Sequence, residues 1–202
     1  MKKILNIVSS IMGDQSFSIK LSQTILDKLQ ATYPGSQVVT RELSKQPFPY
    51  MEESYLAALF TPEESRTPEH KAAVKHSDEA IQELLDADIV VIGAPVYNFA
   101  IPSTLKSWID HIVRAGKTFS YSAQGPEGLV KNKKVYIAIA SGGVFSEGPY
   151  KAYDFVAPYL KLTLGFIGLQ DVEIFRIEGT KVPDVKETAW AKAVSSVEEH
   201  AY

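Results

Sequence analysis

The sequence predicts an α/β fold in which helices cover both faces of one doubly wound sheet of parallel strands. Short apolar runs typical of strands alternate with longer segments of helical periodicity along the whole chain. Three of the five apolar runs hold almost no polar residue, as central strands buried on both faces require, whereas the other two carry charges. No segment repeats and none is of low complexity, so solenoid and fibrous folds are excluded.

Each predicted element has local sequence signals that justify it. The predicted strands are residues 4–8, 37–43, 89–92, 135–139 and 172–178. The predicted helices are residues 18–33, 67–87, 103–113, 156–167 and 182–199. Pro34-Gly35 ends the first helix, Thr67 and Pro68 open the second as N-cap and first helical residue, and Ser103 caps the third.

The charges of two predicted strands indicate the order of the sheet. Residues 37–43 and 172–178 carry arginine and glutamate, which suits edge strands open to water. With these two at the edges, the strands match the order 2-1-3-4-5, the flavodoxin-like arrangement. Ligands of such sheets bind beyond the carboxyl ends of the strands, at the switch point between strands one and three. The loops after strands one, three and four are therefore the candidate binding loops.

Composition and charge exclude several classes of function. The chain of 202 residues is 45% apolar and 22% charged, with 21 basic and 24 acidic residues and a net charge of −3. This balance predicts no nucleic-acid partner and no anionic membrane surface. The absence of cysteine excludes disulfides, a thiol nucleophile and cysteine-ligated metals. Because the apolar runs are too short for a membrane span or a signal peptide, we expect one cytoplasmic domain of residues 1–202.

Two segments exceed the minimal fold. Residues 44–66 contain two prolines and a short apolar patch, and residues 117–133 contain Phe119, Tyr121 and a Gly-Pro-Glu-Gly sequence that predicts a hairpin. Both segments can be surface loops. Alternatively, their aromatic residues form the side of a pocket or a subunit contact.

The loop after the first strand can hold an anion. Ser10, Ser16 and Ser18 bring hydroxyl donors to the start of a helix, whose free N–H groups and partial positive charge attract a phosphate. Neither a Walker pattern nor G-x-G-x-x-G is present, so ATP and a Rossmann-type dinucleotide are poorly supported. The simpler alternative is that Ser16 or Ser18 only caps the helix.

Aromatic and glycine residues follow the third and fourth strands. Tyr97, Asn98 and Phe99 offer stacking surface and donors to a flat ring system, although a packing loop explains them equally well. Residues 141–143 (Ser-Gly-Gly) let backbone approach a ligand closely, or form a plain turn. Because all three loops converge on one edge of the sheet, a phosphate cradle beside an aromatic slot predicts a site for flavin mononucleotide (FMN).

Several segments make the chain similar to the FMN-dependent NADH azoreductase and quinone reductase family along nearly its whole length. The most specific are Pro95-Val96-Tyr97-Asn98-Phe99 and Gly125-Pro126-Glu127-Gly128-Leu129. The other matching segments are Ser9-Ser10, Ser16-Phe17-Ser18, residues 114–119, Gly142-Gly143 and residues 164–168.

This resemblance implies a set of site residues. The FMN phosphate would be held by Ser10, Ser16, Phe17 and Ser18. The isoalloxazine would be flanked by Pro95, Val96, Tyr97, Asn98 and Phe99, and its pyrimidine end closed by Ala140, Ser141, Gly142 and Gly143. Tyr121 would line the substrate slot, and Thr163 occupies a position associated with the substrate pocket. The chain departs from the family at Ala140, where many members carry serine, and at Thr163, where some carry an aromatic residue.

The resemblance also implies a reaction and an assembly. NADH would give a hydride to FMN, and a quinone or aromatic azo compound would then take two electrons in the same slot, with ping-pong kinetics. The flavin carries this chemistry, so no catalytic side chain is expected. Members of the family form homodimers with the slot at the subunit interface, and the apolar patch of residues 44–66 offers surface for one.

Two other classes of protein stay open. A serine hydrolase fits the same sheet, with its nucleophile after the first strand, but needs a histidine base. His70, His76 and His111 fall in predicted helices among polar neighbours, and His200 lies near the end of the chain, so we expect solvated histidines and no metal site. An electron carrier of the flavodoxin type is the other alternative, although such carriers resemble shorter and more acidic chains.

Overall fold

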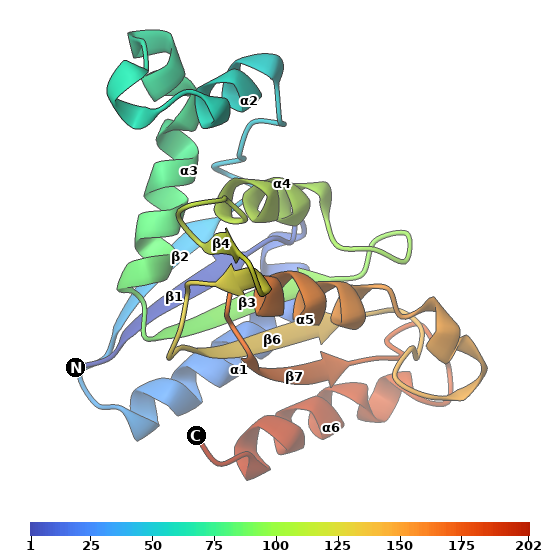
Figure 1. The fold of residues 1–202 in the computed structure, drawn as a ribbon. Coiled ribbons are helices and arrows are strands. Elements are labelled where there is room, and N and C mark those ends of the chain that lie inside the picture. The colour runs from blue at the N-terminus through green and yellow to red at the C-terminus, as the bar shows by residue number, and fades with distance from the viewer.

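The computed structural model describes residues 1–202 and contains one five-stranded parallel sheet in the order β2-β1-β3-β6-β7 (Figure 1). Its strands are β1 (Lys3–Val8), β2 (Gln37–Glu42), β3 (Ile89–Pro95), β6 (Lys134–Ala140) and β7 (Asp171–Ile177). All neighbouring pairs are parallel. Since β6 and β7 are the fourth and fifth strands of this sheet along the chain, the predicted flavodoxin-like order 2-1-3-4-5 is confirmed.

Two apolar cores lie on opposite faces of the sheet. One face is covered by α1 (Phe17–Thr32) and α6 (Lys186–Glu199), the other by α3 (Pro68–Asp86), α4 (Ser103–Ile112) and α5 (Val156–Phe166) (Figure 1). On β3, Val90 and Ile92 belong to the core beneath α3, α4 and α5, whereas Val91 belongs to the core beneath α1 and α6. Every residue of β3 is buried, which is why this strand carries an unbroken apolar run.

The edge strands lie where their charges predicted. The arginine of each edge strand, however, is largely covered rather than open to water. Arg41 of β2 donates from Nε to Oε2 of Glu83 on α3 (2.7 Å), and its side chain is 13% exposed. Arg176 of β7 pairs with Asp154 (2.6 Å) and is 20% exposed. Both guanidinium groups are therefore held in ion pairs against the body of the protein.

Of three predicted helix starts, one agrees with the structure and two differ from it. Thr67 caps α3 as predicted, because its side chain accepts a hydrogen bond from His70 N. The prediction that Ser103 caps α4 is wrong: Pro102 is the N-cap residue, and no side chain caps this helix. The last helix begins at Lys186 rather than at residue 182, since residues 182–185 form turns that include a Val185 N to Val182 O hydrogen bond (3.1 Å).

The two additional segments both have regular structure. Residues 44–66 contain the short helix α2 (Glu53–Phe60) and the 3-10 turn η2 (Glu63–Ser65), which extend away from the sheet together with the start of α3 (Figure 1). The predicted hairpin is confirmed as the antiparallel pair β4 (Phe119–Ser122) and β5 (Gly125–Gly128). This hairpin packs beside the carboxyl-terminal half of α5, where Phe119 contacts Phe166 (ring centroids 4.6 Å apart).

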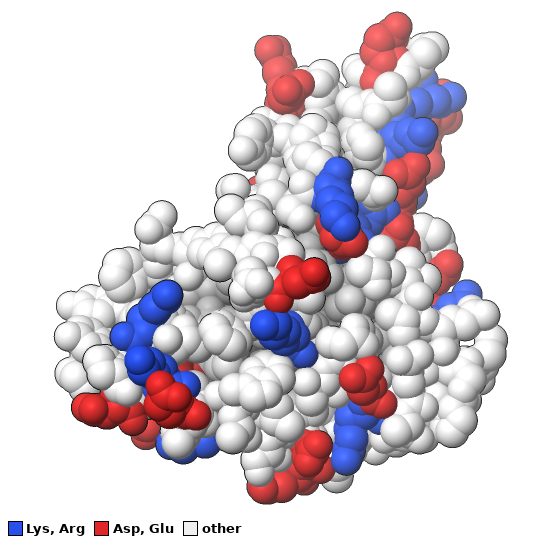
Figure 2. Space-filling model, turned by 180° about the vertical axis from the view of Figure 1, so that it is seen from behind, with Lys and Arg blue, Asp and Glu red and all other residues white.

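The surface carries charges of both signs. On the face shown in Figure 2, Lys and Arg lie among Asp and Glu, with uncharged areas between them, and no continuous basic area spans it. No helix combines the length and the apolar character that crossing a bilayer requires.

Candidate functional site

The three candidate loops begin side by side at the carboxyl edge of the sheet. In the strand register Val8 of β1 lies opposite Gly93 of β3, and Pro95 of β3 lies opposite Ala140 of β6. Hydrogen bonds join the loops where they leave the strands: Ser9 Oγ donates to Gly93 O (2.6 Å), and Val96 N donates to Ala140 O (2.8 Å). The structure therefore brings together the loops that the strand order predicted.

The loop after β1 presents hydrogen-bond donors at the start of α1. Ser16 is the N-cap residue, and its hydroxyl lies 3.0 Å from that of Ser18, with both side chains buried. Lys20 N makes the first bond of the helix ladder, to Ser16 O (3.1 Å), so the N–H groups of Phe17 and Ser18 are free to bind an anion. This loop has the donors of a phosphate cradle, and it includes the cap that the simpler alternative required.

Two further residues of this loop border the cradle. The 3-10 turn η1 (Gly13–Gln15) leads into the helix, and the buried Ser10 places its hydroxyl oxygen 3.3 Å from the hydroxyl oxygen of Tyr97. Phe17 is 40% exposed, and its ring lies near Trp190 of α6 (centroids 6.5 Å apart) and beneath the ammonium group of Lys20 (5.8 Å). A cation and aromatic surface thus accompany the hydroxyls.

The loop after β3 is a tight turn with unusual backbone angles. Tyr97 and Ala100 exchange two hydrogen bonds of 3.0 Å each, and the two residues between them are left-handed, with φ of 50° at Asn98 and 67° at Phe99. A phenylalanine in this region is uncommon and costs free energy, which is typical of functional positions. The turn leaves Phe99 53% exposed beyond the sheet edge. Behind it, Pro95 is buried as the last residue of β3, and Val96 packs against the core.

The loop after β6 leaves two backbone N–H groups without an acceptor in the chain. Gly142 O and Gly143 O accept hydrogen bonds from Lys181 N (2.9 Å) and Gly179 N (3.0 Å), whereas the N–H groups of both glycines have no acceptor in the chain. The hydroxyl of Ser141 donates to Gly143 O (2.7 Å) and so stabilises the loop itself. Ala140, the departure from the family pattern, is 8% exposed at the strand end.

Aromatic residues that the sequence analysis did not single out complete this edge. Phe145 and Tyr153 pack against Phe99, with ring centroids 6.1 and 6.0 Å away, and Tyr150 lies 6.2 Å from Tyr153. Tyr150 and Tyr153 belong to the 3-10 helix η3 (Gly148–Tyr153). We call Phe99, Phe145, Tyr150 and Tyr153 together the aromatic lip. Its sequence signal was the group of aromatic residues that follows the glycine pair in a segment without helical or strand periodicity.

The two predicted substrate residues do not join these loops within one chain. Tyr121 on β4 is 74% exposed and contacts Phe119 of its own strand (centroids 5.5 Å apart). The hydroxyl of Thr163, in the second half of α5, donates to Tyr159 O (2.5 Å) in the preceding turn. No hydrogen bond or ring contact joins either side chain to the three loops within one chain.

The chain is similar to known proteins along nearly its whole length. A family model described as having a flavodoxin-like fold matches residues 2–201. The FMN-dependent NADH:quinone oxidoreductase of Herminiimonas arsenicoxydans is 52% identical over 179 residues, which cover 89% of this chain and 88% of that protein. The corresponding protein of Nostoc sp. is 46% identical over 200 residues, covering 98% of this chain and 97% of that protein. The chain belongs to this flavodoxin-like oxidoreductase family.

Solved structures extend the likeness to three dimensions. The azoreductase from Bacillus anthracis str. Sterne has a TM-score of 0.91 at 33% identity, covering 98% of this chain and 97% of that one. An FMN-dependent NADH-azoreductase from Bacillus anthracis str. Ames Ancestor, solved in complex with FMN, has a TM-score of 0.84 at 26% identity and covers 98% of each chain. The family thus includes a member of nearly the same shape that holds FMN.

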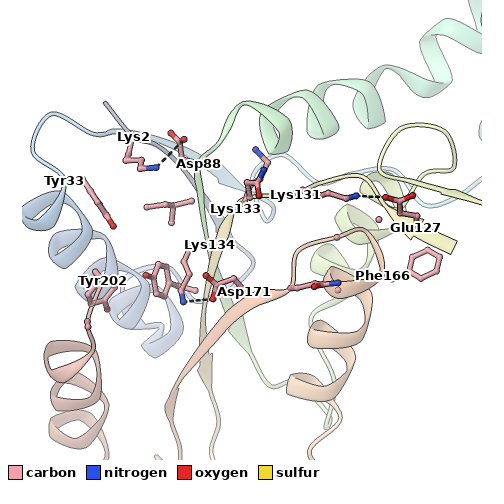
Figure 3. A pocket seen from close by; sticks show the side chains of 18 of the residues that line it. Lys2, Tyr33, Asp88, Glu127, Lys131, Lys133, Lys134, Phe166, Asp171 and Tyr202 are labelled. Carbon is pink, nitrogen blue, oxygen red and sulfur yellow. Dashed lines mark hydrogen bonds and ion pairs between the residues drawn. The ribbon is translucent and has the colours of Figure 1, made fainter.

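This flavodoxin-like protein also has a hollow at the opposite edge of the sheet. It measures about 960 Å³ and lies among the starts of β1, β3, β6 and β7 and the end of the chain (Figure 3). Three of its four lysines are paired with carboxylates: Lys2 with Asp88 (3.7 Å), Lys131 with Glu127, and Lys134 with Asp171 (2.6 Å). Lys133 donates to the carbonyl of Leu85 at the end of α3 (2.7 Å). Three of the four lysine charges in the hollow are therefore compensated by carboxylates.

The histidines of this flavodoxin-like protein do not form a hydrolase site. The serines after β1 bond to Gly93 O, to Tyr97 and to one another, and no histidine ring bonds a serine hydroxyl. The expectation that the helix histidines are solvated is wrong for His111, which is 1% exposed. Its ring lies between Phe48 (5.2 Å) and Tyr55 (4.7 Å), because the segment of residues 44–66 folds over α4.

Burial of His111 makes stability depend on pH. Burial lowers the pKa of this imidazole, whose Nε2 is placed to donate to Pro49 O (3.0 Å) while Nδ1 has no partner. The unfolded chain therefore takes up the proton at a higher pH than the folded chain, and the free energy of unfolding falls as the pH drops below about 6.5. We expect His111→Gln to flatten this loss between about pH 7.5 and 5.5, as measured by urea unfolding.

His76 on α3 is the matched control for this prediction, because its ring is exposed to solvent. His76→Gln should keep most of the slope of the unmodified protein, because burial, the largest cause of the lowered pKa of His111, stays in place. If His111→Gln keeps that slope as well, the buried imidazole does not cause the pH dependence.

Proposed function

We propose that the chain is an FMN-dependent NADH:quinone oxidoreductase that also reduces aromatic azo compounds. The observation that carries this proposal is the meeting of three loops at one edge of the sheet: a donor-rich helix start, a strained aromatic turn and a pair of free glycine N–H groups. The chain's relatives include FMN-dependent NADH:quinone oxidoreductases and azoreductases.

The residues present fit FMN in charge and polarity. The free N–H groups at the start of α1 and the hydroxyls of Ser16 and Ser18 would bind the phosphate dianion, and Ser10 would add a third hydroxyl. The turn of residues 95–99 would lie along the isoalloxazine, with Phe99 offering its exposed ring as a stacking surface. The N–H groups of Gly142 and Gly143 would donate to the pyrimidine end of the ring system.

The protein contributes orientation and charge stabilisation to the reaction. FMN, when bound, supplies the two-electron chemistry between NADH and a quinone or azo acceptor. The backbone donors of Gly142 and Gly143 would favour negative charge at the pyrimidine end, because they are fixed in place before the reaction. Donor and acceptor would stack on the aromatic lip in turn, and one slot used in turn predicts ping-pong kinetics. A rate law that requires both substrates to be bound together would contradict this scheme.

The first experiment is the visible absorption spectrum of the purified protein, before and after NADH is added without oxygen. We expect a flavin band, present on purification or after incubation with FMN, that bleaches with NADH. Many turnovers of NADH with an added quinone would then separate an enzyme from a non-enzymatic electron carrier. A protein that stays colourless after incubation with FMN would overturn the proposal.

We extend the proposal to a homodimer with the slot at the subunit interface. It is supported by the lack of hydrogen bonds and ring contacts between Tyr121 or Thr163 and the loops of their own chain, and by exposed apolar side chains on the segment of residues 44–66, such as Phe60 at 86% exposure. In a dimer, Tyr121 of one protomer would line the slot of the other. Sedimentation equilibrium should therefore report about twice the chain mass of 22.3 kDa, and a fully active monomer would contradict the dimer.

We also propose that residues 1–202 work as one FMN-binding domain in the cytoplasm, without a nucleic-acid or membrane partner. The net charge of −3 and the interspersed charges of the surface support this setting. A heparin column and sedimentation with lipid vesicles test the two excluded partners, since binding to either at physiological salt would count against it.

A further inference from the structure

A single arginine holds together the segment that follows the glycine loop. Arg176 of β7 donates from one nitrogen to Asp154 (2.6 Å) and from the other to Glu178 (3.2 Å). The three side chains are 20%, 13% and 10% exposed, so the network is largely removed from water. A planar guanidinium can bridge two carboxylates in this way, whereas an ammonium group can face only one of them well.

Both carboxylates that bind Arg176 also accept hydrogen bonds from backbone N–H groups. Glu178 Oε1 accepts hydrogen bonds from Phe145 N (3.0 Å) and Ser146 N (3.1 Å), which follow the glycine pair after one intervening residue. Asp154 Oδ1 accepts from Ala157 N (3.2 Å) in the first turn of α5. Arg176 thus ties the two ends of the loop of residues 141–154 to the edge strand β7.

This loop carries three of the four residues of the aromatic lip. Phe145 and Tyr153 both lie within it, and both pack against Phe99 of the turn after β3. Holding the ends of the loop therefore fixes the distance between the glycine donors on one side and the strained turn on the other. Arg176 itself bonds neither the glycine pair nor the turn after β3. It lies on β7, behind the loop.

We propose that Arg176 is a positioning residue that sets the affinity of the site for FMN and for flat aromatic acceptors by holding residues 141–154 against Phe99. The inference rests on the proposed function. Without the guanidinium, Asp154 and Glu178 would be two largely buried carboxylates without a cation, and turning either toward water would release the backbone groups it holds.

The test is Arg176→Met, compared with the unmodified protein by titrating apoprotein into free FMN and following the flavin fluorescence. We expect the Kd for FMN to rise about tenfold, since loosening a binding loop from behind costs affinity without removing a contact. With 1,4-benzoquinone as acceptor, the KM should rise by a similar factor while kcat at saturating FMN stays within about twofold. Arg176→Lys should fall between the two proteins, because it restores one ion pair.

The chain provides a matched control. Arg41 of β2 is also an edge-strand arginine in a largely covered ion pair, with Glu83, but it lies at the other edge of the sheet. Arg41→Met should lower thermal stability without changing the Kd for FMN or the KM for the quinone. If the two methionine variants change both constants equally, or if neither changes them, Arg176 has no positioning role.

Amide hydrogen exchange separates this inference from the proposed function. In apoprotein, Arg176→Met should speed exchange within residues 141–154 and leave the start of α1 unchanged, and equal exchange in both segments would overturn the inference. If the unmodified protein binds no FMN, the proposed function fails, and the exchange pattern still decides whether Arg176 holds the loop. Should Arg176→Met not fold, Arg176→Lys provides the same measurements with a milder change.

Discussion

Replacing Ser18 with alanine is expected to weaken FMN binding by about 10- to 100-fold, the cost of one hydrogen bond to a charged group. The hydroxyl of Ser18 is buried at the start of α1 and has a single partner in the chain, the hydroxyl of Ser16 at 3.0 Å. The fold loses little when that hydroxyl is removed, whereas a phosphate bound there loses a donor. Isothermal titration of apoprotein with FMN gives the affinity, and thermal unfolding of the apoprotein checks that the fold is kept.

Ser22 is the control for this change. It is a buried serine one turn further along the same helix, and its hydroxyl donates to Ser18 O (2.8 Å) rather than toward the loops. Ser22→Ala should leave the FMN affinity unchanged. If Ser18→Ala leaves it unchanged too, the start of α1 does not hold the phosphate, and the simpler role of this loop as a helix cap is sufficient.

The order of the sheet could be predicted because strands that are buried on both faces consist almost entirely of apolar residues. A strand such as β3, buried at every position, cannot carry a charge, whereas an edge strand can. The same reasoning failed for the environment of the edge charges. Arg41 is covered by its pairing with Glu83 of α3, which lies 42 residues further along the chain, and no local pattern indicates such a partner.

The candidate loops could be found for a topological reason, since the carboxyl ends of parallel strands meet at one edge. The aromatic lip could not be found that way, because Tyr150 and Tyr153 lie in a 3-10 helix that has no periodicity to place it. His111 shows the same limit. Its helix predicts a polar outer face, and only the fold of residues 44–66 over that face buries the ring.

Gly128→Ala is expected to have the largest effect on stability. The reason lies in two segments that carried the family resemblance, residues 125–129 and 164–168. A Cβ atom on Gly128 would overlap Gly168 N and the carbonyl carbon of Ile167, so two backbones cross there with no room for a side chain. The crossing joins the hairpin to the end of α5, where Val130 N donates to Ile167 O (2.9 Å). This one contact therefore requires glycine both in the hairpin, at Gly128, and after α5, at Gly168.

An alanine at Gly128 must push one backbone away from the other. We expect the free energy of unfolding to fall by about 3 kcal/mol, at the upper end of the cost of overpacking, and the melting temperature to fall by roughly 6 to 12 °C for a chain of this size. The control is Gly165→Ala in α5, where a Cβ would meet nothing within 4 Å. Alanine is the better helix former, so this variant should be more stable by roughly 0.5 kcal/mol. Urea and thermal unfolding of the two variants should shift in opposite directions. Equal shifts would mean that the hairpin moves freely against α5, and Tyr121 would then have no fixed place from which to reach a neighbouring slot.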